Sequence, residues 1–233
     1  MNYRVGLENN VEGRSLAWVL GHPGCFAYGA DGEEAIFATA EALAEYAGWI
    51  ESHAGESRLE LEGINIVLEE TWEVYDIDEN YNRVAQGYSV NAWFLDDWKP
   101  LTEEEVDWGL KLLAWSRLDL LGGVRGLSAE KLQATYPGER WSINGVLGHV
   151  GGAEWWYMER LGLAPPRQAV PDEPFERLEI VRERLEEALP SLAGSKQVVG
   201  VDGELWSPRK MLRRAVWHER DHTSHIYQLL AAR

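Results

Sequence analysis

The spacing of hydrophobic and polar positions changes near residue 100 and divides the chain into two parts. In the first part, four stretches alternate apolar and polar residues as strands do: 3–8, 14–20, 59–77 and 87–95. Between the second and third of them, residues 31–55 repeat apolar positions at helical spacing and end at Gly55. The resulting order ββαββ predicts a small α+β domain over residues 1–97.

After Pro100 the apolar residues recur at the spacing of helices. The segment "TEEE" reads as a capping box, with Thr102 at the N-cap and Glu105 three residues later. Four long helices are expected over the remaining chain: from 102, from 142, over 172–192, and from 207 to about 231. A short extended pair at 197–206 would turn at Asp202-Gly203. The pattern predicts an all-α, up-down four-helix bundle over residues 101–233.

Composition narrows the class of protein. No apolar run approaches the length of a membrane-spanning helix, and charged residues interrupt the first twenty positions, so neither a transmembrane helix nor a signal peptide is expected. Cys25 is the only cysteine, which excludes an intramolecular disulfide and a cysteine-based zinc site. We expect Cys25 to be a small buried residue and the protein to be cytoplasmic.

The charge is strongly negative and unevenly spread. The formal net charge is −17, and residues 1–95 carry 17 acidic and 4 basic side chains. Binding of nucleic acid requires clustered Lys and Arg, so no nucleic-acid partner is expected. The acidic half is either a well-solvated surface or a docking surface for a basic partner.

Three of the six histidines lie in "AVWHERDHTSHI" near the end of the chain. His218, His222 and His225 share one stripe of the last predicted helix. The i, i+4 spacing of His218 and His222 lets two imidazoles converge on one metal ion, although histidines also occur on plain helix surfaces.

A third ligand is expected from another helix. His149 lies within "WSINGVLGHVGGAEWWYMERLG", where four glycines interrupt the helical pattern at a cost of about 1 kcal/mol each relative to Ala. Close helix approach or room for a ligand would justify that cost. The structural alternative is a core histidine bonded to a carbonyl group.

These two segments together resemble the DinB-like superfamily over roughly residues 101–231. The shared features are the Trp-Ser start at "ERWS", the histidine inside the second helix and the HxxxH pair in the last helix. Members are four-helix bundles, and in many of them these histidines bind a divalent metal. The resemblance implies that His149, His218 and His222 are metal ligands.

The chain departs from the family pattern just after the second HxxxH histidine. Where many relatives have Gly-Gln, this chain has Ser224 and His225. His225 is either a pocket residue or a solvated one. Asp221 would orient an imidazole by accepting its free N–H, and Glu154 is a candidate proton acceptor or a surface charge. The tryptophans near the motifs are either core residues or a substrate platform: Trp155, Trp156, Trp206 and Trp217.

The first domain resembles HicB-like domains. The features are a strand pair, the loop Pro23-Gly24-Cys25, and "GADGEEA" from Gly29 to Ala35, which opens a helix. Relatives are antitoxins that usually carry a separate DNA-binding segment. None is visible here, so the resemblance implies a scaffold or docking role.

Three histidines would leave coordination positions open, which is typical of catalytic metal sites. We therefore expect a metal-dependent enzyme of the thiol-transferase or hydrolase type that acts on a small molecule. The ion is expected to be Zn or Ni, with Fe or Mn as further options, and a low-molecular-weight thiol is a candidate cofactor. The alternative is a non-catalytic metal-binding stress-response protein with the acidic domain as its docking module. Relatives are often homodimers, and the sequence is compatible with one.

Overall fold

The computed structural model describes residues 1–57 and 59–231 and divides the chain into two compact units. The first unit comprises Met1–Lys99 and Val198–Lys210, and the second comprises Pro100–Gln197 and the chain from Met211 onward. The sequence-based domain limits, 1–97 and 101–233, stay a prediction. The compact units differ from them mainly because 198–210 groups with the N-terminal unit.

The first unit is built on a four-stranded sheet. The sheet has the order β3-β2-β1-β4, with β1 (Asn2–Val11) antiparallel to β2 (Arg14–Val19) and parallel to β4 (Asn65–Glu73). Strand β3 (Phe26–Gly29) pairs antiparallel with β2 and was not expected, because four residues are too few to show a periodic pattern.

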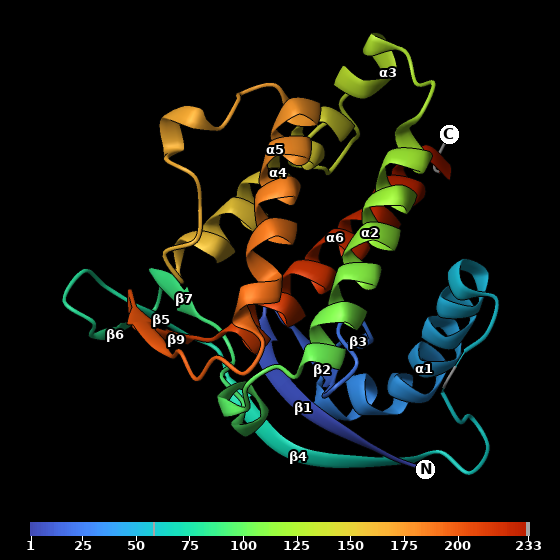
Figure 1. Cartoon of the computed structure of the whole chain (residues 1–233), viewed down its shortest axis with the longest axis vertical. Coiled ribbons are helices and arrows are strands. Elements are labelled where there is room, and N and C mark those ends of the chain that lie inside the picture. The colour runs from blue at the N-terminus through green and yellow to red at the C-terminus, as the bar shows by residue number, and fades with distance from the viewer. Residues whose placement is uncertain (58, 232–233) are drawn as a thin grey trace. The chain divides into compact units, whose positions relative to one another are not determined.

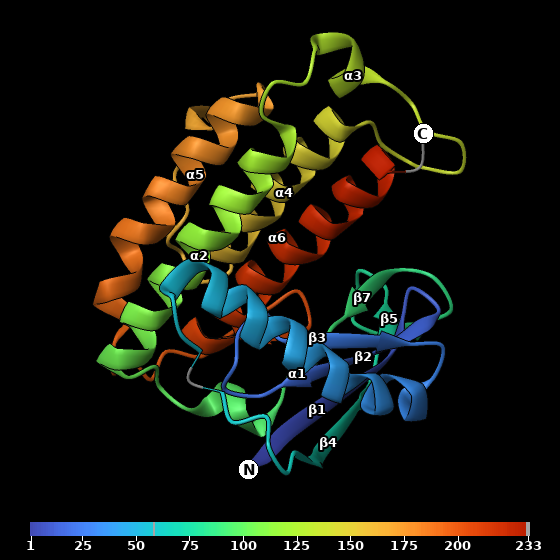
Figure 2. The same cartoon turned by 90° about the vertical axis from the view of Figure 1, so that its right-hand side faces the viewer.

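Helix α1 (Gly32–Ala54) packs against strands β1, β2 and β3 of this sheet (Figure 2). It begins at Asp31, whose side chain accepts a hydrogen bond from the Glu34 amide at 2.9 Å, and ends at Gly55 in the left-handed region. The small side chains of Ala17, Ala27 and Ala35 let the helix and the strands approach closely. Cys25 is buried, as expected.

Short strands complete the first unit. A three-stranded sheet has the order β6-β5-β7: β5 is Tyr75–Ile77, β6 Arg83–Val84 and β7 Tyr88–Val90. A 3₁₀ turn follows at Leu95–Trp98. Strands β8 (Val199–Val201) and β9 (Glu204–Trp206) form a hairpin whose central residues, Asp202 and Gly203, both have positive φ, at 51° and 80°. This confirms the predicted turn.

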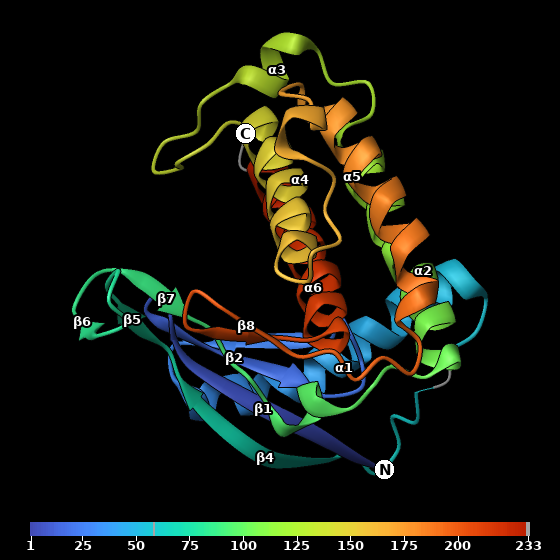
Figure 3. The same ribbon diagram turned by 60° about the vertical axis from the view of Figure 1, so that its left-hand side comes forward.

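The second unit is helical (Figures 1 and 3). Its helices are α2 (Glu103–Val124), α3 (Ala129–Gln133), α4 (Ile143–Glu159), α5 (Pro174–Ala188) and α6 (Pro208–Ala231), of which α6 starts in the first unit. Two 3₁₀ turns lie at Arg167–Ala169 and Leu189–Leu192. A sheet-containing N-terminal region and a helical C-terminal region agree with the predicted fold class at this level.

The predicted helix starts are confirmed. Thr102 and Glu105 form the reciprocal capping box of α2, with bonds of 3.1 and 2.8 Å. The hydroxyls of Ser142 and Ser207 each accept a hydrogen bond from an amide three residues later, Gly145 and Lys210. Caps depend on a few neighbouring residues, so the sequence alone locates them.

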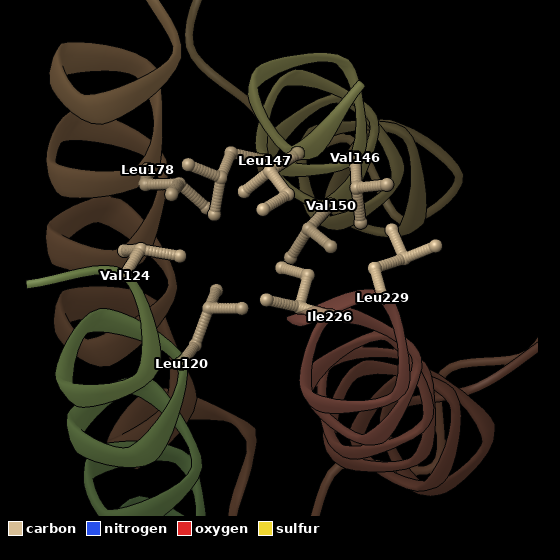
Figure 4. Packing of buried hydrophobic residues seen from close by; sticks show 9 residues of the cluster. Leu120, Val124, Val146, Leu147, Val150, Leu178, Ile226 and Leu229 are labelled. Atoms are coloured by element: carbon tan, nitrogen blue, oxygen red, sulfur yellow. The ribbon is translucent and has the colours of Figure 1, made fainter. Parts of the chain in front are cut away.

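Apolar side chains from the four long helices pack together at one level of the helical unit (Figure 4). We call this group the apolar cluster; its members are Leu120, Val124, Ile143, Val146, Leu147, Val150, Leu178, Ile226 and Leu229. Each is no more than 5 % exposed, so the cluster supplies a continuous hydrophobic core. Among the described residues, no helix is long and apolar enough to cross a membrane.

Candidate metal centre

Three imidazoles from two helices converge beside the apolar cluster. His149 lies on α4, while His218 and His222 lie one turn apart on α6. The Nε2 atom of His218 is 3.0 Å from Nε2 of His149 and 3.1 Å from Nε2 of His222. We call these residues the imidazole trio. The ligand atoms of the trio all lie within 4.8 Å of one another.

The spacing of these nitrogens suits a shared cation. An ion about 2.0–2.1 Å from each imidazole nitrogen holds two of them roughly 2.8–3.4 Å apart, depending on whether the angle at the ion is octahedral or tetrahedral. The two Nε2···Nε2 distances of 3.0 and 3.1 Å lie within that range. The trio has the donor atoms and the convergence to hold a metal.

The electrostatic surroundings keep the imidazoles of His218 and His222 neutral. Burial lowers the pKa of His218 well below its ordinary value, and the neighbouring His222, His149 and Arg214 lower it further. Burial, His149 and His225 lower the pKa of His222 to about 3. A neutral imidazole is the form that binds metal, so the ligands need not lose protons near neutral pH.

The ring plane of His149 is held by Trp141, which precedes α4. The two rings stack with centroids 4.5 Å apart and planes inclined by 26°, and the Arg140 guanidinium lies 4.6 Å from the Trp141 ring centre. On α4, Gly145 makes room for this tryptophan, since an added Cβ would meet Trp141 Cβ at 3.0 Å.

The glycines of α4 divide into two kinds. Gly145 and Gly151 allow close approach, because a Cβ at Gly151 would also meet a neighbour, Arg177 Cγ, at 3.0 Å. At Gly148 and Gly152 the nearest atoms would be at ordinary contact distances, 3.7 and 3.9 Å. Of the two explanations that the sequence left open, close approach of another helix applies at Gly151, which faces Arg177 of α5, while Gly145 makes room for Trp141 just before its own helix.

The sequence left Glu154 as either a proton acceptor near the metal or a surface charge, but in the structure its carboxylate is bound by two arginines. Its Oε1 accepts a hydrogen bond from Arg182 Nε at 2.6 Å, and its Oε2 accepts one from Arg117 Nη2 at 2.7 Å. Both oxygens of this carboxylate are thus occupied by guanidinium donors. This geometry disfavours the predicted role of Glu154 as a proton acceptor.

The same two arginines hold a second carboxylate. Glu219 Oε1 accepts from Arg117 Nε at 2.5 Å, and Oε2 accepts from Arg182 Nη2 at 2.8 Å. Burial alone would raise the pKa of Glu219, but the charges of Arg182 and Arg117 outweigh burial and lower it. Arg117, Glu154, Arg182 and Glu219 thus close a ring of alternating charge, which we call the ion-pair ring.

The other predicted site residues lie on α6 around the trio. The imidazole of His225 lies 6.1 Å from that of His222, between ring centres, and its Nε2 is 2.9 Å from Glu139 Oε2. Asp221 is half-buried and directly precedes His222 in the chain. The Nδ1 atom of His222 has no hydrogen-bond partner among the described residues. Catalytic roles for Asp221 and His225 stay predictions.

Of the tryptophans that the sequence left open, two are clearly core residues: Trp206 and Trp217 are 0 % and 7 % exposed. Trp155 and Trp156 are half-buried, and the Trp155 indole N–H donates to the Pro165 carbonyl at 2.9 Å.

The sequence assigned no role to Glu139 or to three members of the ion-pair ring, and it used Trp141 only as a family feature without its contact to His149. One signal was available for the arginines. Arg117 lies four residues after Leu113, and Arg182 lies four residues after Leu178, so both charges interrupt an apolar stripe. A charged residue at a core position indicates a buried partner of opposite charge.

A comparison with protein families gives one match. Residues 112–226 match the model of the DinB superfamily, and this segment of just under half the chain includes all three histidines. No curated protein and no solved structure matches the chain. Over residues 112–226 the helical region is therefore similar to the DinB superfamily, while the HicB-like character of residues 1–97 stays a prediction.

Proposed function

Starting from a DinB-like helical region, we propose that the trio His149, His218 and His222 binds one divalent metal ion at the centre of an enzyme site. The observation that carries this proposal is the approach of three imidazole nitrogens from two helices. The reaction we propose is of the thiol-transferase or hydrolase type, on a small molecule.

Three protein ligands leave coordination positions for a substrate or a water molecule. A bound ion would lower the pKa of a water or a low-molecular-weight thiol and so supply an anionic nucleophile. All-imidazole donor sets suit Zn and Ni best, and Fe or Mn are further candidates.

His225 and Glu139 would carry out proton transfer at the edge of this site. The Glu139 carboxylate 2.9 Å from Nε2 favours the tautomer with the proton on Nε2. Nδ1 of His225 is then the proton acceptor of the ring. We propose that His225 takes the proton of the incoming nucleophile, and that Asp221 orients a neighbouring imidazole.

Metal content is the direct test of the proposed site. Purified wild-type protein, freed of any affinity tag, is expected to hold about one ion per chain, because the described part of the chain contains one such trio. His222→Ala should lose it. His53→Ala, which removes a histidine from the first unit, should retain it and serves as the matched control.

Absence of bound metal in the wild type after reconstitution with Zn²⁺, Ni²⁺ and Mn²⁺ would overturn the proposal. If metal binds, a screen of thiol-transfer and hydrolysis reactions follows, with His225→Ala expected to lower kcat at unchanged metal content. Binding without turnover in any of these reactions would favour the non-catalytic alternative.

A further inference from the structure

The ion-pair ring draws one side chain from each long helix of the second unit. Arg117 comes from α2, Glu154 from α4, Arg182 from α5 and Glu219 from α6. Their side chains are only 10 %, 5 %, 6 % and 2 % exposed, respectively. Two positive and two negative charges compensate each other, so the ring is neutral as a whole.

The arginines also bind the backbone of facing helices. Arg117 Nη1 donates to the Leu178 carbonyl of α5, and Arg182 Nη1 donates to the Leu113 carbonyl of α2. Each guanidinium therefore contacts two carboxylates and one carbonyl in a fixed planar geometry. These bonds are directional, so they specify both the height and the rotation of the helices.

Stability alone is a weak explanation for such a ring. Removing four charges from water is costly, and well-packed apolar residues of similar volume often stabilise a core at least as well. The benefit of buried ion pairs is best established where they select one register among several. The apolar cluster lacks this selectivity, because hydrophobic contacts are non-directional.

The trio is the feature that needs a defined register. Glu219 follows His218 directly on α6, and Glu154 lies five residues after His149 on α4. On the other side of the trio, Val146 of α4 and Ile226 of α6 belong to the apolar cluster. Helices α4 and α6 are thus linked on both sides of the histidines. The ion-pair ring links them by directional bonds on one side, and the apolar cluster links them by non-directional contacts on the other.

We propose that the ion-pair ring is a positioning device for the metal centre. It sets the rotation and height of α6 against α4, so that His218 faces His149. Binding constellations must be held to within about 0.5 Å of the productive geometry, and apolar packing of Val and Leu side chains does not ensure this. The inference rests on the proposed metal site but requires no particular reaction.

The first test compares Glu154→Gln with Leu189→Ala in the full chain. Glu154→Gln keeps the shape of the side chain and removes one charge of the ring. Leu189 is fully buried in the 3₁₀ turn at Leu189–Leu192 and belongs to neither the ring nor the apolar cluster, so its truncation controls for a general loss of stability.

Two measurements separate positioning from stability. In metal-free protein, ¹⁵N NMR of the imidazoles should show shifted resonances for the trio in Glu154→Gln and wild-type resonances in Leu189→Ala. In metal-loaded protein, Co²⁺ absorption and chelator competition should show altered ligand geometry and about 10–100-fold weaker binding in Glu154→Gln alone, the usual effect of removing a group that supports metal ligands.

A second variant covers the case in which Glu154→Gln fails to fold. Replacing Arg117, Glu154, Arg182 and Glu219 together by Met leaves no unpaired charge, so cooperative unfolding should persist. The positioning role predicts several imidazole environments and weak metal binding in this folded protein. Wild-type spectra and affinity would overturn the inference. If the wild type binds no metal, the proposed function fails, and the metal-free NMR comparison still decides the positioning role.

Discussion

Two polar clusters are buried in the helical unit, and their ionisable groups differ in charge. In the imidazole trio, the pKa values of His218 and His222 are lowered, so these two rings are neutral. In the ion-pair ring, the pKa of Glu219 is lowered and that of Arg182 is raised, so these two groups are charged. Burial opposes charge in both clusters, so the difference comes from their neighbours.

The neighbours decide what each cluster does. Glu219 lies between two guanidinium groups whose attraction outweighs the cost of burying its charge. His218 instead faces two imidazoles and the positive charge of Arg214. In the ring every charged group has a partner of opposite sign, which makes it a structural element. In the trio three nitrogen donors face one another, which makes it a receptor for a cation.

Removing one member of the trio should have the largest effect. His218→Ala deletes the imidazole whose Nε2 lies 3.0 Å from Nε2 of His149 and 3.1 Å from Nε2 of His222. Metal affinity should fall by more than the roughly 10–100-fold that loss of a supporting group costs. Chelator competition measures this, with exposed Ser224→Ala on the same helix as control. Equal affinities in the two variants would contradict the assignment of His218 as a ligand.

Breaking the ring should destabilise the fold. Arg182→Met leaves Glu154 and Glu219 sharing one guanidinium, and loss of one partner of a buried ion pair costs about 3–5 kcal/mol. Urea unfolding measures the change. Arg184→Met, which removes a half-exposed arginine from the same helix, should cost less than about 1 kcal/mol. If Arg182→Met lowered the free energy of unfolding as little as Arg184→Met, the ion-pair ring would not be the structural element that sets it apart from the trio.

In metal-free protein, acid should lower the stability of the fold through protonation of the trio. The folded-state pKa of His222 is about 3, below its ordinary value of 6.5, so between these values the unfolded state binds the proton and the folded state does not. The free energy of unfolding should therefore fall with decreasing pH, by about 1.4 kcal/mol per pH unit for each such histidine. Above pH 6.5 the titration of His222 should not affect the free energy of unfolding.

Urea unfolding at about pH 7 and about pH 5 checks this dependence, because the two values bracket the ordinary histidine pKa. The slope should be shallower in His222→Ala. Identical slopes in wild type and variant would show that His222 titrates normally in the folded protein.

The smallest effect is expected at the edge of the site. The His225–Glu139 pair is partly exposed, at 29 % and 35 % of the side chains, so Glu139→Gln should change the free energy of unfolding by less than about 1 kcal/mol. Metal content should not change. A loss of metal would place Glu139 among the groups that support the trio.

Local rules account for what the sequence alone determined. Helix starts at Thr102, Ser142 and Ser207 follow from capping, since the cap and its partner lie within three residues. The turn at Asp202-Gly203 and the shared face of His218 and His222 follow from backbone geometry. These features require no knowledge of distant parts of the chain.

Tertiary structure decided which residues far apart in the sequence meet. His149 and His218 are 69 residues apart in sequence, and Arg117 and Glu219 are 102 apart. The family resemblance predicted that His149 and His218 lie together, whereas nothing in the sequence predicted the contact between Arg117 and Glu219. Helical periodicity places a charge on a core-facing stripe but does not name its partner, since that depends on how four helices are rotated against one another. The charge state of each buried group follows from this packing, because the partner decides whether burial removes the charge or retains it.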